Sequence, residues 1–393
     1  MHILYYDWDE FNGSDARDAM KRLGHEVDVI KSGRDRFKCT EDVELRFRQE
    51  VTRAKELQEK YDAVFSFNYF PFISDLCNYY GIRYVSWVFD SPHYPLYSVN
   101  ILNPCNRVYV FDKRIAKEHA ENGITTIGYS PLGVNENRLK KFCDALDAET
   151  DGRIVYQHDV SFVGSLYDNE FNFYDQIQGL PPELRLYWDD LIIRQERVYG
   201  KDLFSEKSQT DGKMLDELMH YVEFENSGSY NLDYRRVLLD FLRKKVTINE
   251  RKNILRELGS RFDTVMYTNP DAPWIDGVPN LGIADYNERM PRVFRRSKIN
   301  INITMRSILS GIPLRVMDVL AAGGFLLTSY TPEIEEYFTD GVDLAIARTP
   351  EEMIEKTAYY LEHEDERKEI AVNGQRKVFE RFSYTGLLPG ILG

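Results

Sequence analysis

The sequence predicts an α/β protein with two parallel sheets, one in each half of the chain. Short apolar runs alternate with segments of helical periodicity from residue 2 to residue 111, and the alternation returns after residue 251. A polar, charge-rich stretch at 135–157 lies between the halves. Strands that alternate with helices form parallel sheets covered by helices on both faces. Such sheets bind ligands beyond the carboxyl ends of their strands.

In the N-terminal half, the expected strands are short apolar runs and the expected helices have apolar residues three and four positions apart. The first helix has this spacing and ends at Gly24, a residue that commonly terminates helices. The expected strands are His2–Tyr6, Glu26–Ile30, Ala63–Phe67, Tyr84–Phe89 and Arg107–Phe111, and the expected helices are Asp15–Leu23, Val43–Lys60 and Ile73–Tyr80.

The C-terminal half starts at the apolar strand Val160–Val163 and continues through a largely helical region. We therefore expect a Rossmann-like domain at 1–147 and a second at 157–375, with a helical insertion near 168–250. Residues 376–393 form a C-terminal segment, for which a return to the first domain is one option. The later expected strands are Thr264–Tyr267, Ile299–Ile303, Phe325–Thr328 and Leu344–Ala347, and the helices are Asn253–Gly259, Met290–Arg296, Leu314–Ala322, Pro332–Phe338, Pro350–His363 and Asp365–Asn373.

Composition restricts the partners. The 393 residues carry a net charge of −14, and an acidic surface repels nucleic acid and anionic membranes. No apolar run reaches the roughly 18 to 20 residues that a membrane-spanning helix needs. The four cysteines are scattered, without a C-x-x-C pair, which is typical of reduced thiols. We expect a cytoplasmic protein without nucleic-acid partners or an integral membrane segment.

The stretch 310–330 is the most informative, since it predicts a glycine-containing loop, a helix, a Gly-Gly stop and a strand. Backbone N–H groups at such a helix start bind anions, here near Gly311 and Ile312. One turn into the helix, Arg315 can bind a diphosphate with its planar guanidinium. Asp318 lies one turn further and can accept hydrogen bonds from ribose hydroxyls. The alternative is a capped amphipathic helix whose charged side chains are only solvated.

Several segments resemble one family. Residues 311–318, 322–330 and 333–338, with 285–304 upstream, are similar to the C-terminal half of the CgeB-like (spore-maturation-type) glycosyltransferases. Residues 87–94 and 162–167 resemble the domain of unassigned function commonly fused ahead of it. The resemblance implies the GT-B fold, two Rossmann-like domains facing across a cleft. The C-terminal domain would bind a nucleotide sugar, most often a UDP-sugar, and the N-terminal domain an acceptor.

A more distant resemblance links the chain to the retaining glycosyltransferases of family 4, which carry two glutamates eight residues apart. Asp318 stands at the second glutamate and implies a ribose contact, whereas Ser310 replaces the first. The resemblance favours retention over inversion. It implies Arg306 and Arg315 as counter-charges of the diphosphate and Glu333 as a contact of the donor sugar. The full set implied to bind the nucleotide sugar is Gly164, Arg306, Ser310, Gly311, Ile312, Arg315, Asp318, Gly323 and Glu333.

A second candidate site follows the strand Tyr84–Phe89. Asp90 and His93 lie in a loop at its carboxyl end, where a carboxylate beside an imidazole can take a proton from an acceptor. The alternative is a turn that Asp90 caps and in which His93 is a partly buried aromatic residue. With Arg315 as the group that stabilises the leaving diphosphate, Asp90 and His93 complete the candidate catalytic set.

The acidic run 7–10 invites a metal hypothesis, because paired carboxylates bind Mg²⁺ or Mn²⁺. It follows the first strand of the expected acceptor domain rather than the donor loop, so we expect no metal site. We also expect no cofactor beyond the nucleotide sugar, which acts as co-substrate. Two alternatives to a hexosyltransferase remain open: a nucleotide-sugar epimerase of the same shape, and a non-catalytic nucleotide-sugar-binding subunit.

Overall fold

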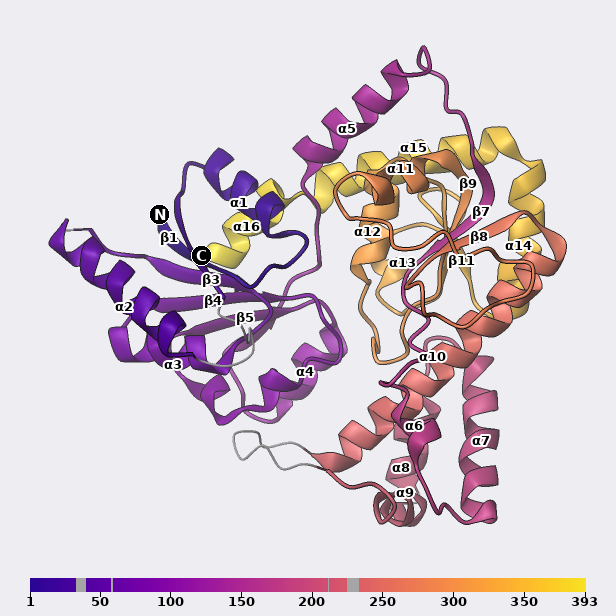
Figure 1. Ribbon diagram of the computed structural model, residues 1–393, viewed down its shortest axis with the longest axis horizontal. Coiled ribbons are helices and arrows are strands. Elements are labelled where there is room, and N and C mark those ends of the chain that lie inside the picture. Colours follow the sequence, from indigo (N-terminus) through magenta and orange to yellow (C-terminus); the bar gives the residue numbers. More distant parts are fainter. Residues whose placement is uncertain (33–39, 58, 211, 225–232) are drawn as a thin grey trace. The chain divides into compact units, whose positions relative to one another are not determined.

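The computed structural model describes residues 1–32, 40–57, 59–210, 212–224 and 233–393 (Figure 1). They form two compact units. Unit 1 holds the described residues from 1 to 138 together with 380–393, and unit 2 holds those from 139 to 379. The division lies inside α5 (Glu136–Ala148), earlier in the chain than the boundary that the sequence predicted at 147–157.

Unit 1 contains a six-stranded parallel sheet in the order β2-β1-β3-β4-β5-β6. The central strand β3 is buried along its whole length, as its predominantly apolar sequence predicts. The strands are β1 (His2–Asp7), β2 (Glu26–Lys31), β3 (Ala63–Phe67), β4 (Arg83–Val88), β5 (Asn106–Val110) and β6 (Ile127–Tyr129); the α-helices of this part are α1 (Gly13–Arg22), α2 (Glu41–Glu56), α3 (Pro71–Tyr80) and α4 (Lys113–Glu121).

Unit 2 contains a five-stranded parallel sheet in the order β11-β10-β9-β7-β8. Its core includes the fully buried side chains of β7, β9 and β10. The strands are β7 (His158–Val163), β8 (Thr264–Tyr267), β9 (Ser297–Asn302), β10 (Leu326–Ser329) and β11 (Ala345–Ala347); the helices between and after them are α11 (Arg289–Arg296), α12 (Leu314–Ala321), α13 (Ile334–Tyr337), α14 (Pro350–Glu362) and α15 (Glu364–Arg381).

A helical insertion separates β7 from β8. Its short helices pack with the N-terminal half of α10, whose C-terminal half reaches the sheet (Figure 1). Asp233 caps α10 by accepting a hydrogen bond from the backbone N–H of Arg235. The insertion consists of α6 (Phe173–Gln176), α7 (Pro182–Glu196), α8 (Leu203–Thr210), α9 (Gly212–Met219) and α10 (Tyr234–Arg261).

The last helix, α16 (Tyr384–Leu392), lies with unit 1. Tyr384 is buried against the rings of Trp87 and Phe67, at centroid distances of 5.4 and 6.2 Å, and its hydroxyl accepts a hydrogen bond from Asn12. The backbone of Val134 exchanges hydrogen bonds with Phe382 and Tyr384. The chain therefore completes the core of its first unit with its last residues.

Each sheet has a topological switch point, where successive connections leave in opposite directions. In unit 1 it lies between β1 and β3, and in unit 2 it lies between β7 and β9. Ligands of open α/β sheets bind beyond the carboxyl ends of the strands at such points. The predicted α/β class with two Rossmann-like units is confirmed, and the strand β6, which the sequence analysis missed, extends the first sheet.

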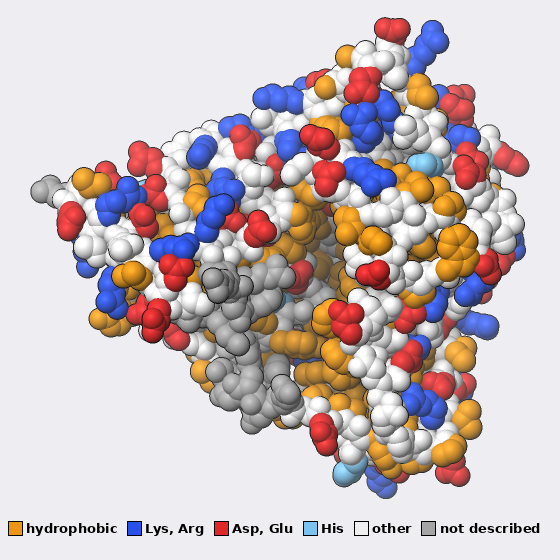
Figure 2. Space-filling model, in the orientation of Figure 1, with side chains coloured by type: hydrophobic (Ala, Val, Ile, Leu, Met, Phe, Trp, Pro, Cys, Tyr) orange, Lys and Arg blue, Asp and Glu red, His pale blue; other side chains and the backbone are white. Residues whose placement is uncertain are grey.

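The described helices include none with both the length and the apolar character needed to cross a bilayer. On the face drawn in Figure 2, positive and negative side chains are interspersed over both units. This mixture accompanies the net charge of −14.

Candidate functional site

The predicted phosphate loop of unit 2 joins the carboxyl end of β9 to the start of α12. Ser310, Gly311 and Ile312 are buried in it. The Ser310 hydroxyl donates a hydrogen bond of 2.7 Å to Glu333 Oε1, and the backbone N–H of Glu333 donates one of 3.0 Å to the Ser310 carbonyl. These contacts bring together Ser310 and Glu333, which the sequence analysis proposed for different parts of the site. They hold Glu333, which is 1% exposed, beside the loop.

Arg315 and Asp318 lie on one face of α12, because residues three apart in a helix are neighbours. Arg315 Nη1 lies 3.4 Å from Asp318 Oδ2, and the guanidinium lies 5.3 Å from the centre of the Phe294 ring. Asp318 is buried and accepts a hydrogen bond of 3.3 Å from the Tyr286 hydroxyl. An ion pair of 3.4 Å is weak. The Arg315 side chain, which is 24% exposed, is therefore accessible to an anion.

Arg306, which was expected to offset the charge of a diphosphate, has hydrogen-bonding partners within the protein. Its Nε donates to Glu250 Oε2 at 2.8 Å, and its Nη1 and Nη2 donate to the carbonyls of Val198 and Glu196 at 2.8 and 3.2 Å. The guanidinium also lies 4.3 Å from the centre of the Tyr199 ring. Arg306 joins the insertion to the loop after β9 through these contacts.

Gly323, which was expected in the nucleotide-sugar site, lies at the far end of α12 from the loop. Its φ of +70° places it in the left-handed region, and a Cβ there would lie 2.3 Å from Arg295 Nη1. Gly323 therefore allows the tight turn between α12 and β10. Gly164, by contrast, lies at the carboxyl end of β7, where its N–H donates to the Tyr267 carbonyl at 3.0 Å.

The sequence analysis missed Arg251, which reaches the loop after β7 from α10. Its Nη1 donates to the carbonyl of Ser165, and its Nε and Nη2 donate to the carbonyl of Ile303 at 3.2 and 2.6 Å. Arg251 therefore lies at the switch point between β7 and β9. In the sequence, Arg251 stands seven residues after Lys244, a spacing that places both on the same face of a helix. Neither residue belongs to a recognisable motif.

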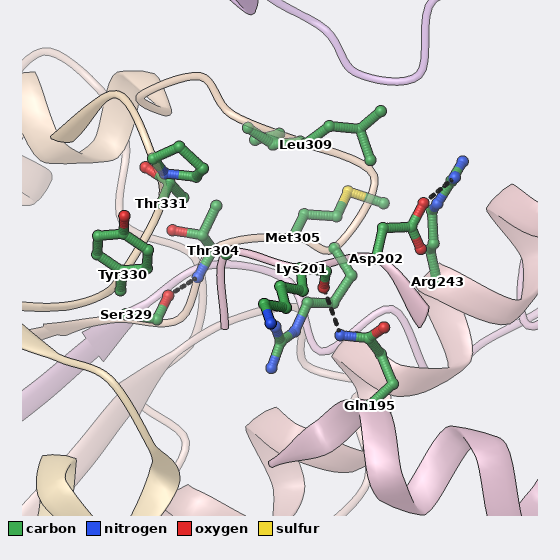
Figure 3. Close-up of a pocket in the computed structure, with 14 residues that line it drawn as sticks. Gln195, Lys201, Asp202, Arg243, Thr304, Met305, Leu309, Ser329, Tyr330 and Thr331 are labelled. Atoms are coloured by element: carbon green, nitrogen blue, oxygen red, sulfur yellow. Dashed lines mark hydrogen bonds and ion pairs between the residues drawn. The ribbon is translucent and has the colours of Figure 1, made fainter. Parts of the chain in front are cut away.

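A small, open hollow lies beyond the carboxyl ends of β9 and β10 (Figure 3). The Ser329 hydroxyl accepts a hydrogen bond of 2.9 Å from the Thr304 N–H and so joins the two strand ends. The insertion contributes the other side of the hollow, where Arg243 pairs with Asp202 at 2.5 Å. Its lining is Gln195, Gly200, Lys201, Asp202, Arg243, Thr304, Met305, Arg306, Ile308, Leu309, Ser329, Tyr330, Thr331 and Pro332.

In unit 1, the Asp90–His93 loop is held by the loop after β3. Asn68 Nδ2 donates to Asp90 Oδ2 at 2.8 Å, and Asn68 Oδ1 accepts hydrogen bonds from the N–H groups of Phe89 and Asp90. His93 Nε2 lies 3.0 Å from the Tyr69 carbonyl oxygen. Burial lowers the pKa of His93, so its ring is neutral near pH 7. Asp90 is exposed, and it is the more accessible of the two groups.

The acidic run after β1 divides between different partners. Asp7 pairs with Arg17 at 3.0 Å. Glu10 accepts hydrogen bonds from the Tyr5 hydroxyl and, at 3.0 Å, from the Trp8 N–H, and burial raises the pKa of its carboxyl. Within the part of the chain that the structure describes, no three His, Cys, Asp or Glu side chains are grouped to hold a metal ion.

The C-terminal part of the chain is similar to a known family. Residues 236–388 match the family described as "Glycosyl transferase-like". The matched segment runs from α10 into α16 and includes Arg251, the loop at 310–312, Arg315, Asp318 and Glu333. No curated protein is significantly similar to the sequence.

Solved structures with similar chains include several transferases. Sucrose-phosphate synthase from Thermosynechococcus elongatus is 10% identical, with a TM-score of 0.49 over 100% of this chain and 98% of that one. A glycosyltransferase from Rickettsia africae is 12% identical, with a TM-score of 0.47 over 100% and 96%. The HepE protein of Anabaena, solved with UDP and glucose, is 12% identical, with a TM-score of 0.47 over 100% and 98%.

Proposed function

We propose that this protein is a glycosyltransferase that moves a hexose from a nucleoside diphosphate sugar, preferably a UDP-sugar, to an acceptor. One observation carries the proposal: the loop before α12, Arg315, Asp318 and the Ser310–Glu333 pair form one cluster after β9. The whole cluster lies inside the segment that is glycosyl transferase-like. We further propose a CgeB-like relationship for the chain and a GT-B arrangement for its two units.

Each member of the cluster has a role that follows from its chemistry. The first backbone N–H groups of α12 and the Arg315 guanidinium bind the diphosphate, whose charge grows as the bond to the sugar breaks. The buried Asp318 carboxylate accepts hydrogen bonds from the ribose hydroxyls. We assign the donor sugar to the hollow after β9 and β10, because Glu333 directly follows Pro332, a residue of its lining.

The acceptor is assigned to unit 1, with Asp90 as the group that takes its proton. Asp90 is exposed, whereas His93 is buried and neutral, so we propose that His93 positions the loop through the backbone of Tyr69, whose N–H and carbonyl both lie within hydrogen-bonding distance of Nε2. Transfer with retention is favoured, and the proposed mechanism needs no metal because cationic side chains and helix dipoles offset the diphosphate charge.

Thermal unfolding of the full chain with UDP-glucose, UDP-galactose, UDP-N-acetylglucosamine and GDP-mannose tests the donor class. A bound donor at 100 times its dissociation constant adds about 2.7 kcal/mol of stability. Donor consumption is then followed with and without candidate acceptors. Consumption that needs no acceptor, with interconversion of the sugar, would identify an epimerase instead. Binding without any turnover would identify a non-catalytic subunit.

A further inference from the structure

Arg251 occupies the switch point of unit 2, which is the position where an open parallel sheet binds its ligand. Its guanidinium joins two carbonyl groups, those of Ser165 after β7 and Ile303 after β9. These carbonyls follow neighbouring strands of the sheet. Three of the five guanidinium N–H groups are used in this way, and the Tyr167 side chain is a further hydrogen-bonding partner of the guanidinium.

Within the described part of the chain, no carboxylate lies within 4.0 Å of the Arg251 guanidinium, and Glu250 acts on its charge only from a greater distance. The side chain is only 8% exposed. Other buried arginines nearby differ: Arg243 pairs with Asp202 and Asp240, and Arg306 pairs with Glu250. A buried charge is costly unless it is paired. This guanidinium has carbonyl and aromatic contacts, but it lacks a counter-ion.

Further positive charge lies close to Arg251. Burial lowers the pKa of Arg251; Tyr167 and Glu250 raise it in part, and the nearby Arg315 lowers it by repulsion. Lys244, two turns earlier on α10, shares one aromatic ring with Arg251: Tyr167 lies 5.4 Å from the Lys244 Nζ and 5.0 Å from the Arg251 Cζ. Burial lowers the pKa of Lys244 as well. Several like charges gathered at one switch point favour an anion bound among them.

The backbone at Tyr167 supports a ligand-binding role for this loop. Its φ of +58° lies in the left-handed region, which is unfavourable for an aromatic residue. The Ser165 hydroxyl holds this conformation by accepting a hydrogen bond of 3.0 Å from the Tyr167 N–H. Strain of this kind is concentrated at ligand-binding sites. Here it keeps the ring against Arg251 and Lys244.

We propose that Arg251 binds the diphosphate of the nucleotide sugar at the β7–β9 switch point, opposite Arg315, so that the diphosphate supplies its missing counter-ion. This inference rests on the proposed function, from which the diphosphate is taken. The planar guanidinium can offer an N–H group that binds no carbonyl to a phosphate oxygen. α10 would thereby link the helical insertion to donor binding. Lys244 adds positive charge near the site, where its Nζ lies over the Tyr167 ring.

Titration calorimetry of the full-length protein with UDP and with UMP tests this assignment. The variants are Arg251→Lys, which keeps the positive charge but loses the planar guanidinium that can bind two oxygens at once, and Arg251→Met, which loses the charge as well. Arg256→Met on the exposed face of the same helix is the matched control. We expect Arg251→Lys to weaken UDP binding about 10- to 100-fold, the loss of one charge-assisted interaction, and UMP binding by less than about threefold. Arg256→Met should leave both affinities unchanged.

Inorganic pyrophosphate provides a second measurement that requires no Arg251 variant. Because the buried Arg251 guanidinium has no carboxylate in contact with it, pyrophosphate should raise the unfolding temperature of the natural protein more than chloride does at equal ionic strength. UDP should compete with pyrophosphate for this site. Folded Arg251 variants that bind UDP as the natural protein does would overturn the inference and leave the proposed function intact. A natural protein that binds none of UDP, GDP and ADP would overturn both.

Discussion

The ion pair between Arg306 and Glu250 allows a direct test of whether Arg306 fastens the fold or binds the donor. The pair joins the loop after β9 to α10 at 2.8 Å, with side-chain exposures of 11% and 1%. We consider the variant Arg306→Met, which keeps most of the side-chain length, and the double variant Arg306→Met/Glu250→Gln. The single change leaves a buried carboxylate without its cation, and the double change removes both charges.

The expected magnitudes follow from this burial. Removing one partner of a buried ion pair costs about 3–5 kcal/mol, chiefly because the remaining charge is uncompensated. Arg306→Met also loses hydrogen bonds to the carbonyls of Val198 and Glu196, so we place it in the middle of that range. The double variant should recover about 2 kcal/mol, which is within the usual coupling between residues in contact.

Hydrogen exchange followed by mass spectrometry measures this cost locally, because peptides from α10 report the opening free energy of that helix. This readout avoids treating a two-unit chain as a single two-state unfolding unit. Titration with UDP on the same samples measures donor affinity, which should change less than about twofold in the double variant. Arg256→Met is again the control, and an exposed substitution of this kind stays within about 0.5 kcal/mol. The structural reasoning fails if exchange in α10 is unchanged while UDP affinity falls tenfold or more, since Arg306 would then be a donor ligand.

Three further outcomes are expected. Arg315→Ala should lower turnover about 100- to 1,000-fold because it removes a charge that stabilises the leaving diphosphate. Asp318→Asn should instead raise KM and leave turnover within about tenfold of the natural value. Steady-state kinetics at varied donor concentration distinguishes the two effects. Turnover should persist in excess EDTA, and complete loss restored by Mn²⁺ would show that a metal site had been overlooked. Burial lowers the pKa of His119 from 6.5 to about 4, so the unfolded chain binds a proton first and stability should fall by up to about 3 kcal/mol as pH falls from 6.5 to 4. His119→Gln should flatten that pH profile in urea titrations, and an unchanged profile would rule out this origin.

Periodicity determined the α/β class and most of the strands and helices, because each element must present its own apolar pattern to the core. β3 and β8 agree with the predicted ranges, and α12 differs by one residue at its end. The sequence also predicted that the loop at 310–312 lies next to Arg315 and Asp318, because these residues belong to one continuous loop and helix. Local spacing is enough to bring such residues together.

The tertiary structure alone decided which arginines are available to a ligand. Arg306 and Arg251 both lie near the strand ends of unit 2, and nothing in their sequence neighbourhoods distinguishes a paired guanidinium from an unpaired one. Their roles depend on Glu250, which faces Arg306, and on two carbonyls from separate strands that contact Arg251. These contacts join residues 52 to 86 positions apart. Charge compensation in a protein interior depends on distances and burial, and only the folded chain sets these across such separations.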